Sequence, residues 1–228
     1  MQLCRTAAAE TGLSGVVVTL VSALSSSQAV LAASDEVSRA RQELQFSTGE
    51  GPACDVHTSG RPVLVPALPA ESGRWPAYVA AAVDAGVCAV FTFPLHQGAL
   101  RIGALSGYSD HPRGLSTGEL AVLLDRAGDA TTHILDSTGR DPGAVGRDRA
   151  ESVHLRNEVY QAQGIVTEQL GVGLAEALSR IRAHAFAAGL DLDALAIDIV
   201  AGRVRLTDDR SPTTDPEPRP RRPETEAP

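Results

Sequence analysis

The hydrophobic pattern changes once along this chain of 228 residues, and the change divides the chain into parts. Residues 1–137 mix short β-branched or aromatic runs with segments of helical period, whereas residues 148–206 keep the helical period alone. Residues 138–147 lie between these parts and are polar and rich in Gly and Arg, with one Pro, which is typical of a linker. We therefore expect two domains of different class.

The first domain is predicted to be an α+β fold, with flanking helices on an antiparallel sheet. Five strand candidates are β-branched or aromatic-rich and bounded by Gly, Pro or Ser: 14–21, 28–33, 61–66, 87–95 and 101–108. A short Gly-containing stretch joins the last two, which is typical of an antiparallel hairpin. Helices are expected over 2–11, 36–45, 75–86 and from Ser116 to about Leu135. Ser116 and Glu119 have the spacing of a capping box at the start of the last helix.

The second domain is predicted to be an all-α bundle of three helices, over about 149–170, 174–188 and 192–201. Gly171 and Gly189 follow the first two helices, where glycine is preferred. Because the loops are so short, the helices must fold back on one another.

Residues 207–228 form a predicted disordered tail. The last 21 residues contain six prolines and hardly any apolar side chain, so they cannot offset the entropy cost of ordering.

Charge and composition exclude several classes of protein. The net charge is −8 and all 20 basic residues are arginine, so general coating of nucleic acid is excluded and any polyanion site must be local. No apolar run approaches the roughly 18 residues of a membrane span, and no secretory signal is evident. Cys4, Cys54 and Cys88 form neither a disulfide framework nor a zinc pattern. We expect a cytoplasmic protein that holds no metal and no cofactor.

Residues 161–200 carry small and apolar residues, with one arginine, at a recognisable spacing. They are Ala162, Gly164, Val166, Gly171, Ala177, Ile181, Arg182, Ala185, Leu192, Leu195 and Ala196. This pattern resembles the ANTAR domain, the RNA-binding output module of antitermination regulators. The resemblance implies binding of stem-loops in nascent RNA, usually by a dimer. Two positions depart from the family pattern, because Gln163 stands where Lys is common and Thr167 where Met is common.

With this resemblance, polar residues of the predicted bundle become candidates for RNA binding. The candidates are Arg156, Tyr160, Gln163, Gly164, Arg180, Arg182 and His184. The helical spacing predicts that four polar residues point together away from the apolar stripe: Arg156, Tyr160, Gln163 and Thr167. Arginine binds phosphates and stacks on bases, and aromatic rings also stack on bases. Arg180 and Arg182 are equally compatible with solvated side chains that lie along the apolar stripe, and both interpretations stay open.

Most of residues 1–137 resemble a GAF domain. The similar parts are the turn at 49–52, the strand at 61–66 and the hairpin that ends in "RIGALSGY". The resemblance implies a sensor and dimerisation domain. Glu50, Cys54 and Trp75 are the candidates for binding a small molecule. The turn that carries Glu50 can instead be purely structural, and Cys54 can be a small core residue.

The two resemblances together predict a signal-responsive transcription antitermination regulator. Its expected partners are RNA stem-loops, a second copy of the chain and a small-molecule ligand of the GAF domain, with no membrane. The alternative is a GAF signalling protein whose bundle binds protein instead of RNA. A third possibility is reduction of free methionine sulfoxide, which some GAF domains perform with cysteines. The surroundings of Cys54 and Cys88 do not resemble that group, so we expect no enzyme activity.

Overall fold

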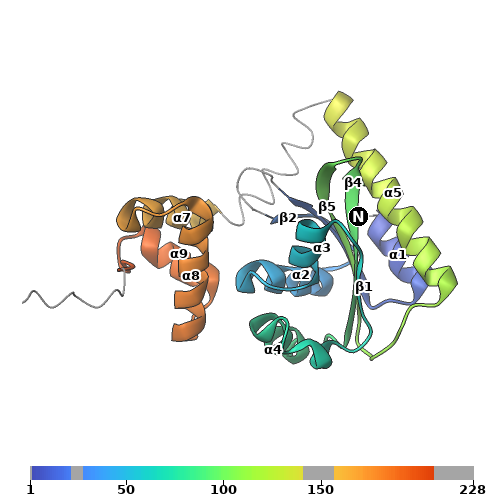
Figure 1. Cartoon of the computed structure of the whole chain (residues 1–228), viewed down its shortest axis with the longest axis horizontal. Coiled ribbons are helices and arrows are strands. Elements are labelled where there is room, and N and C mark those ends of the chain that lie inside the picture. The colour runs from blue at the N-terminus through green and yellow to red at the C-terminus, as the bar shows by residue number, and fades with distance from the viewer. Residues whose placement is uncertain (1, 22–27, 141–156, 208–228) are drawn as a thin grey trace, which may run out of the picture.

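The computed structural model describes residues 2–21, 28–140 and 157–207. Figure 1 shows a sheet with helices on both faces and a separate group of three helices beside it. The antiparallel sheet and its helices make the first domain, named the sensor domain after the resemblance of its sequence to GAF domains, and the three helices make the bundle. Among the described residues, no helix combines the length and apolar composition that crossing a membrane requires.

The sheet has five strands in the order β2-β1-β5-β4-β3, and every pairing is antiparallel. The strands are β1 (Gly15–Val21), β2 (Gln28–Ala33), β3 (Val63–Val65), β4 (Ala89–Gln97) and β5 (Leu100–Ser109). All five predicted strands are present, and the predicted hairpin is the β4–β5 pair. Both the α+β class and the antiparallel sheet are therefore confirmed.

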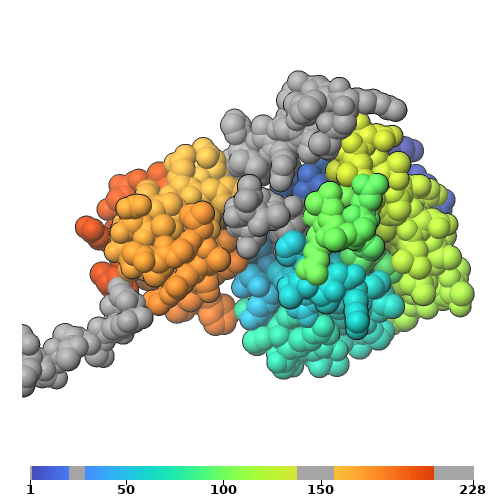
Figure 2. Space-filling model, turned by 45° about the horizontal axis from the view of Figure 1, so that its top comes forward, coloured from blue at the N-terminus to red at the C-terminus, as the bar shows by residue number. Residues whose placement is uncertain are grey.

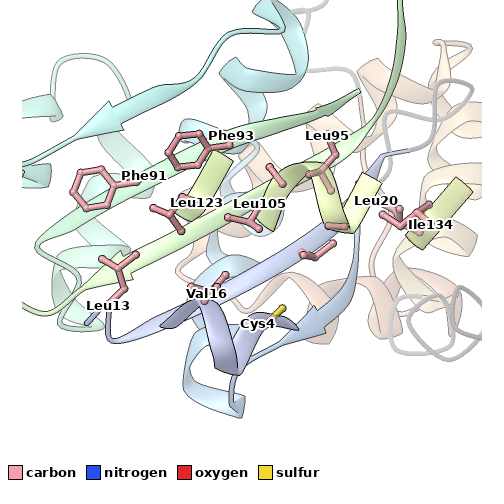
Figure 3. Packing of buried hydrophobic residues seen from close by; sticks show 14 of the residues in the cluster. Cys4, Leu13, Val16, Leu20, Phe91, Phe93, Leu95, Leu105, Leu123 and Ile134 are labelled. Carbon is pink, nitrogen blue, oxygen red and sulfur yellow. The ribbon is translucent and has the colours of Figure 1, made fainter. Parts of the chain in front are cut away.

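One face of the sheet packs against α1 (Gln2–Thr11) and α5 (Thr117–Arg140). Successive strand residues point to opposite faces, so Val16 and Val18 join this core while Val17 joins the other one. Figure 3 shows Phe91 and Phe93 of β4 beside Leu123 of α5. The helix α5 ends at Arg140, five residues beyond the predicted end at about Leu135. The predicted linker thus begins inside a helix, and residues 141–147 lie outside the described part.

The other face carries α2 (Glu36–Thr48), α3 (Pro52–Ser59), the short 3₁₀ segment η1 (Leu68–Glu71) and α4 (Pro76–Asp84). The helix α2 continues three residues beyond its predicted end, to a left-handed glycine cap at Gly49. The helix α3 has no counterpart among the predicted helices, since eight residues carry too little periodic pattern to be recognised. It begins with a proline at its first position, after Gly51.

The bundle consists of α7 (Asn157–Leu170), α8 (Leu174–Ala188) and α9 (Leu192–Val200), packed around one apolar cluster. Asp191 caps α9, because its Oδ1 accepts from the backbone N–H groups of Asp193 and Ala194. The three predicted helices are thus present. Residues 149–156 of the first one and residues 208–228 of the predicted tail lie outside the described residues.

The predicted capping box forms at the start of α5. The backbone N–H of Ser116 donates to Glu119 Oε2 at 2.7 Å, and the N–H of Glu119 donates to Ser116 Oγ at 3.3 Å. Arg113 also forms an ion pair with Glu119. These donors lower the pKa of Glu119 from 4.5 to about 2, with the hydrogen bond from Arg113 as the largest cause.

We predict that this carboxylate makes the protein less stable in acid. Because the folded pKa lies below the unfolded one, its stabilisation is present above pH 4.5 and is lost as the pH falls toward about 2. Glu119→Gln should flatten this part of the dependence of the unfolding free energy on pH, as measured by urea denaturation between pH 2.5 and 7. An unchanged pH profile in Glu119→Gln contradicts the assignment.

The packing of Gly103 in β5 against β1 predicts the effect of a second substitution. A Cβ at Gly103 would lie 1.8 Å from the carbonyl oxygen of Thr19 in β1. Gly103→Ala should therefore destabilise the chain by about 1–3 kcal/mol through overpacking. Gly128→Ala is the matched control within α5, where the new Cβ meets nothing within 4 Å and should stabilise the chain by roughly 0.5–1 kcal/mol. Equal unfolding free energies of the two variants in urea would rule out the close approach.

Candidate functional site

A buried polar cluster lies between the sheet and the helices α2 and α4. Its members are Arg41, Gln42 and Gln45 of α2, Tyr78 of α4 and Tyr108 of β5. The two tyrosines and Gln45 are fully buried, and Gln42 is 2% exposed. The helix α2 therefore presents hydrogen-bonding groups to the sheet where a sheet-covering helix normally presents apolar ones.

Gln45 holds three elements of this cluster together. Its Nε2 donates to Tyr108 Oη at 3.1 Å, and its Oε1 accepts from the backbone N–H of Ala53 in α3 at 2.7 Å. The hydroxyl of Tyr108 in turn donates to Gln42 Oε1 at 2.8 Å. A Cβ at Gly51, where φ is 122°, would lie 2.7 Å from Gln45 Oε1, so the turn before α3 requires glycine.

Three donors of the cluster remain without a partner. Tyr78 Oη, Gln42 Nε2 and Arg41 Nε are buried and make no hydrogen bond within the described residues. Arg41 Nη2 does form an ion pair, with Asp110 at 2.8 Å. Burial raises the pKa of Tyr78 well above its usual value, and the neighbouring Tyr108 adds to this shift, so the phenol keeps its proton. The cluster thus offers N–H and O–H groups to a molecule that carries acceptor atoms.

Glu50 occupies the turn between α2 and α3, but its carboxylate is engaged. Its Oε2 accepts from the backbone N–H groups of Ala77 at 3.1 Å and Tyr78 at 3.4 Å, in the first turn of α4. A carboxylate at a helix N-terminus satisfies free N–H groups and interacts favourably with the helix dipole. In this structure Glu50 therefore caps α4, which corresponds to the structural alternative for this turn.

The other two residues predicted for a ligand site lie beside Tyr78. Trp75 is 3% exposed, and its ring meets that of Tyr78 edge to face with 6.3 Å between centroids. Cys54 is half-buried and forms no disulfide bond within the described residues, and it contributes to the raised pKa of Tyr78. The sequence analysis missed Gln42, Gln45, Tyr78 and Tyr108. The spacing of the two glutamines, three residues apart on a predicted helix, fits a solvated face equally well and therefore did not indicate a buried cluster.

In the bundle, the prediction that Gln163 points outward is wrong. Its side chain is 3% exposed, and Nε2 donates to the carbonyl oxygen of Leu174 at 2.6 Å. The first turn of α8 covers this face of α7, so the amide ties the two helices together. Thr167, which shares the predicted outward face, has a buried hydroxyl.

The remaining candidates for RNA binding differ in exposure. Gly164 is partly exposed, Arg180 forms an ion pair with Glu176 at 3.1 Å, and His184 is exposed. Arg156 lies outside the described residues.

Tyr160 and Arg182 come together, and they meet at the sensor domain. Phe46 of α2 has its ring 6.3 Å from the ring of Tyr160, edge to face, and the Arg182 guanidinium lies 4.9 Å from the same ring. Figure 2 shows the bundle, in orange, lying against the blue part of the sensor domain that includes α2. Two candidate residues of the bundle thus face the sensor domain.

Comparison with known proteins gives a family for the first domain. The model of the GAF domain matches residues 1–135. No curated protein matches the chain.

Several solved structures resemble it, at low identity. The GAF3 domain of a Synechocystis protein is 15% identical over 60% of this chain and 91% of that one, with a TM-score of 0.49. The GAF domain of an Acinetobacter phosphoenolpyruvate-protein phosphotransferase is 12% identical over 60% and 80%, with a TM-score of 0.47. Free methionine-R-sulfoxide reductase from Neisseria meningitidis is 17% identical over 61% and 79%, with a TM-score of 0.44. None of these likenesses bears on what the chain binds.

The hydrogen bonds of the two tyrosines predict opposite effects of the same substitution. Tyr78→Phe removes a buried hydroxyl without a partner and should stabilise the chain by about 1 kcal/mol. Tyr108→Phe leaves groups of Gln42 and Gln45 unpaired and should destabilise it by about 1–3 kcal/mol. Urea unfolding of purified, dialysed protein measures both. Destabilisation by Tyr78→Phe would show that its hydroxyl already has a partner.

Proposed function

Because the chain belongs to the GAF domain family, we propose that it is a signal-responsive transcription antitermination regulator. In this proposal the sensor domain binds a small molecule and the bundle is an ANTAR-like module that binds RNA stem-loops. The proposal includes a cytoplasmic homodimer without catalytic activity. The observation that carries it is the contact of Phe46 in the sensor domain with Arg182 and Tyr160 in the bundle.

The polar cluster supports a sensory role for the first domain. Leaving a buried donor unpaired costs about 1–3 kcal/mol, and the cluster contains three such donors. A ligand that accepts hydrogen bonds would relieve this cost. The ligand chemistry that fits is a small molecule with carbonyl or carboxylate oxygens, since all three free groups donate.

The arrangement of the ANTAR-like pattern supports the assignment of the bundle. Most of its apolar and alanine positions form the bundle core, each 5% exposed or less: Ala162, Val166, Ala177, Ile181, Ala185, Leu192, Leu195 and Ala196. The pattern therefore encodes the close packing of the three helices. The polar candidates that lie outside this core are Tyr160, Arg180, Arg182 and His184, and Gln163 is no longer among them.

The alternative, a bundle that binds protein, is favoured by one residue. Phe186 of α8 is 73% exposed, and aromatic residues are enriched in the centres of protein interfaces. Phe186→Ala should leave RNA affinity unchanged under the first proposal, and loss of a protein partner in that variant supports the alternative.

We predict that the full chain binds hairpin RNA from its own leader transcript, with an affinity that falls as salt rises. Arg180→Ala should weaken binding several-fold and lower the salt slope by about 0.7 if Arg180 contacts one phosphate of a single-stranded loop. Arg61→Ala is the control, since Arg61 is an exposed arginine of the sensor domain. Fluorescence anisotropy with labelled RNA at several salt concentrations measures both quantities. Equal salt slopes for Arg180→Ala and Arg61→Ala contradict the proposed RNA surface.

A further inference from the structure

Phe46 belongs to the sensor domain by sequence and to the bundle by packing. It lies on α2, next to Gln45, which binds the sensor's own sheet and α3. Its side chain is 3% exposed and is part of the apolar cluster of the bundle, together with Val159 and Ile181. In the C-terminal turn of α2, Gln45 therefore contacts the sensor domain and Phe46 contacts the bundle.

Two further contacts surround this ring. The ring of Tyr160 meets it edge to face at an interplanar angle of 72°, and the guanidinium of Arg182 lies over it. Both arrangements are favourable, because the edge of one ring and a cation each interact with the negative face of an aromatic ring. Phe46 thus contacts the aromatic and the cationic candidate residue of the bundle at once.

The turn that follows Phe46 also leaves room for Arg182. Gly49 caps α2 in the left-handed conformation, with φ at 73°. A Cβ at this position would lie 3.0 Å from Arg182 Nη1 and 3.2 Å from Arg182 Cδ, tighter than ordinary contacts. A residue other than glycine would push this side chain away. The sensor domain is therefore shaped to receive Arg182, independently of the Phe46 ring.

We propose that Phe46 is an autoinhibitory plug, which holds the bundle against the sensor domain and covers Tyr160 and Arg182. Tyr160 and Arg182 become accessible to a partner only when Phe46 separates from the bundle. What the uncovered surface binds rests on the proposed function, whereas the opening and closing of the contact does not.

The polar cluster lies close enough along the chain to control this plug. Gln42 and Gln45 occupy the same helix as Phe46, within about one helical turn of it. A ligand that accepts from Gln42 Nε2 pulls on the amide whose Oε1 accepts from Tyr108 and lies 3.4 Å from Gln45 Nε2, and this disturbs the hydrogen bonds that fix Gln45. The last turn of α2 then shifts, and Phe46 moves with it.

The expected size of the effect follows from the two ring contacts. Loss of both should change the ratio of closed to open chains by about tenfold or more. Coupling between two sites typically lies in the range of about 5- to 150-fold, so a plug of this strength suffices for regulation.

The test compares Phe46→Ala and Phe46→Leu with Val37→Ala in the full chain. Val37 is the matched control because it lies on the same helix and is 60% exposed. Small-angle X-ray scattering gives the radius of gyration, and hydrogen exchange reports the protection of α8. Phe46→Ala should increase the radius of gyration and speed exchange in α8, Phe46→Leu should do so less, and Val37→Ala should match the unaltered chain.

Labelled hairpin RNA provides the third measurement. Opening together with about tenfold tighter RNA binding in Phe46→Ala supports the plug and the proposed function. Opening without any RNA binding supports the plug and overturns the RNA-binding function. An unchanged radius of gyration and unchanged exchange overturn the plug, whatever the RNA result. If Phe46→Ala lowers the yield of folded protein, Arg182→Gln tests the same contact from the bundle. For this variant only the radius of gyration and the exchange of α8 decide, because Arg182 is itself a candidate RNA-binding residue.

Discussion

The sensor domain depends on two hydrogen bonds that the buried side-chain amide of Gln45 makes. The amide connects α2 to the sheet through Tyr108 and to the first turn of α3 through Ala53. Because the amide is fully buried, neither bond has water as a substitute. The amide fits because position 51 is glycine, where a Cβ would lie 2.7 Å from Gln45 Oε1. These two hydrogen bonds, together with the apolar cluster between the sheet and the helices, hold α2 and α3 in place.

This arrangement joins the polar cluster to the contact between the two domains through a single helix, α2. The polar side of α2 carries two of the three donors that have no partner among the described residues. Its C-terminal end places Phe46 in the apolar cluster of the bundle. A change at the first location has a short path to the second, since both belong to one rigid element. The same helix therefore provides a physical basis for communication between a GAF domain and a C-terminal helical bundle.

Much of the fold could be predicted because it depends on local pattern. Alternating β-branched runs located the strands, and the spacing of Ser116 and Glu119 located the start of α5. The polar cluster could not be predicted, because glutamines on a helix normally indicate a solvated face, and only the sheet position of Tyr108 shows otherwise. Gln163 was misplaced for a related reason, since helical spacing does not reveal that the first turn of α8 covers it. Phe46 escaped notice because the helix continues beyond its predicted end, and because its neighbours come from a different domain.

The capping of α4 by Glu50 has a mechanical consequence. The carboxylate belongs to the turn that links α2 and α3, yet it is bonded to the N–H groups that begin α4. The helices α2, α3 and α4 on that side of the sheet are thereby connected at one residue, Glu50. A displacement of α2, α3 or α4 is therefore transmitted to the other two helices through Glu50. The three helices respond to a bound molecule as one unit.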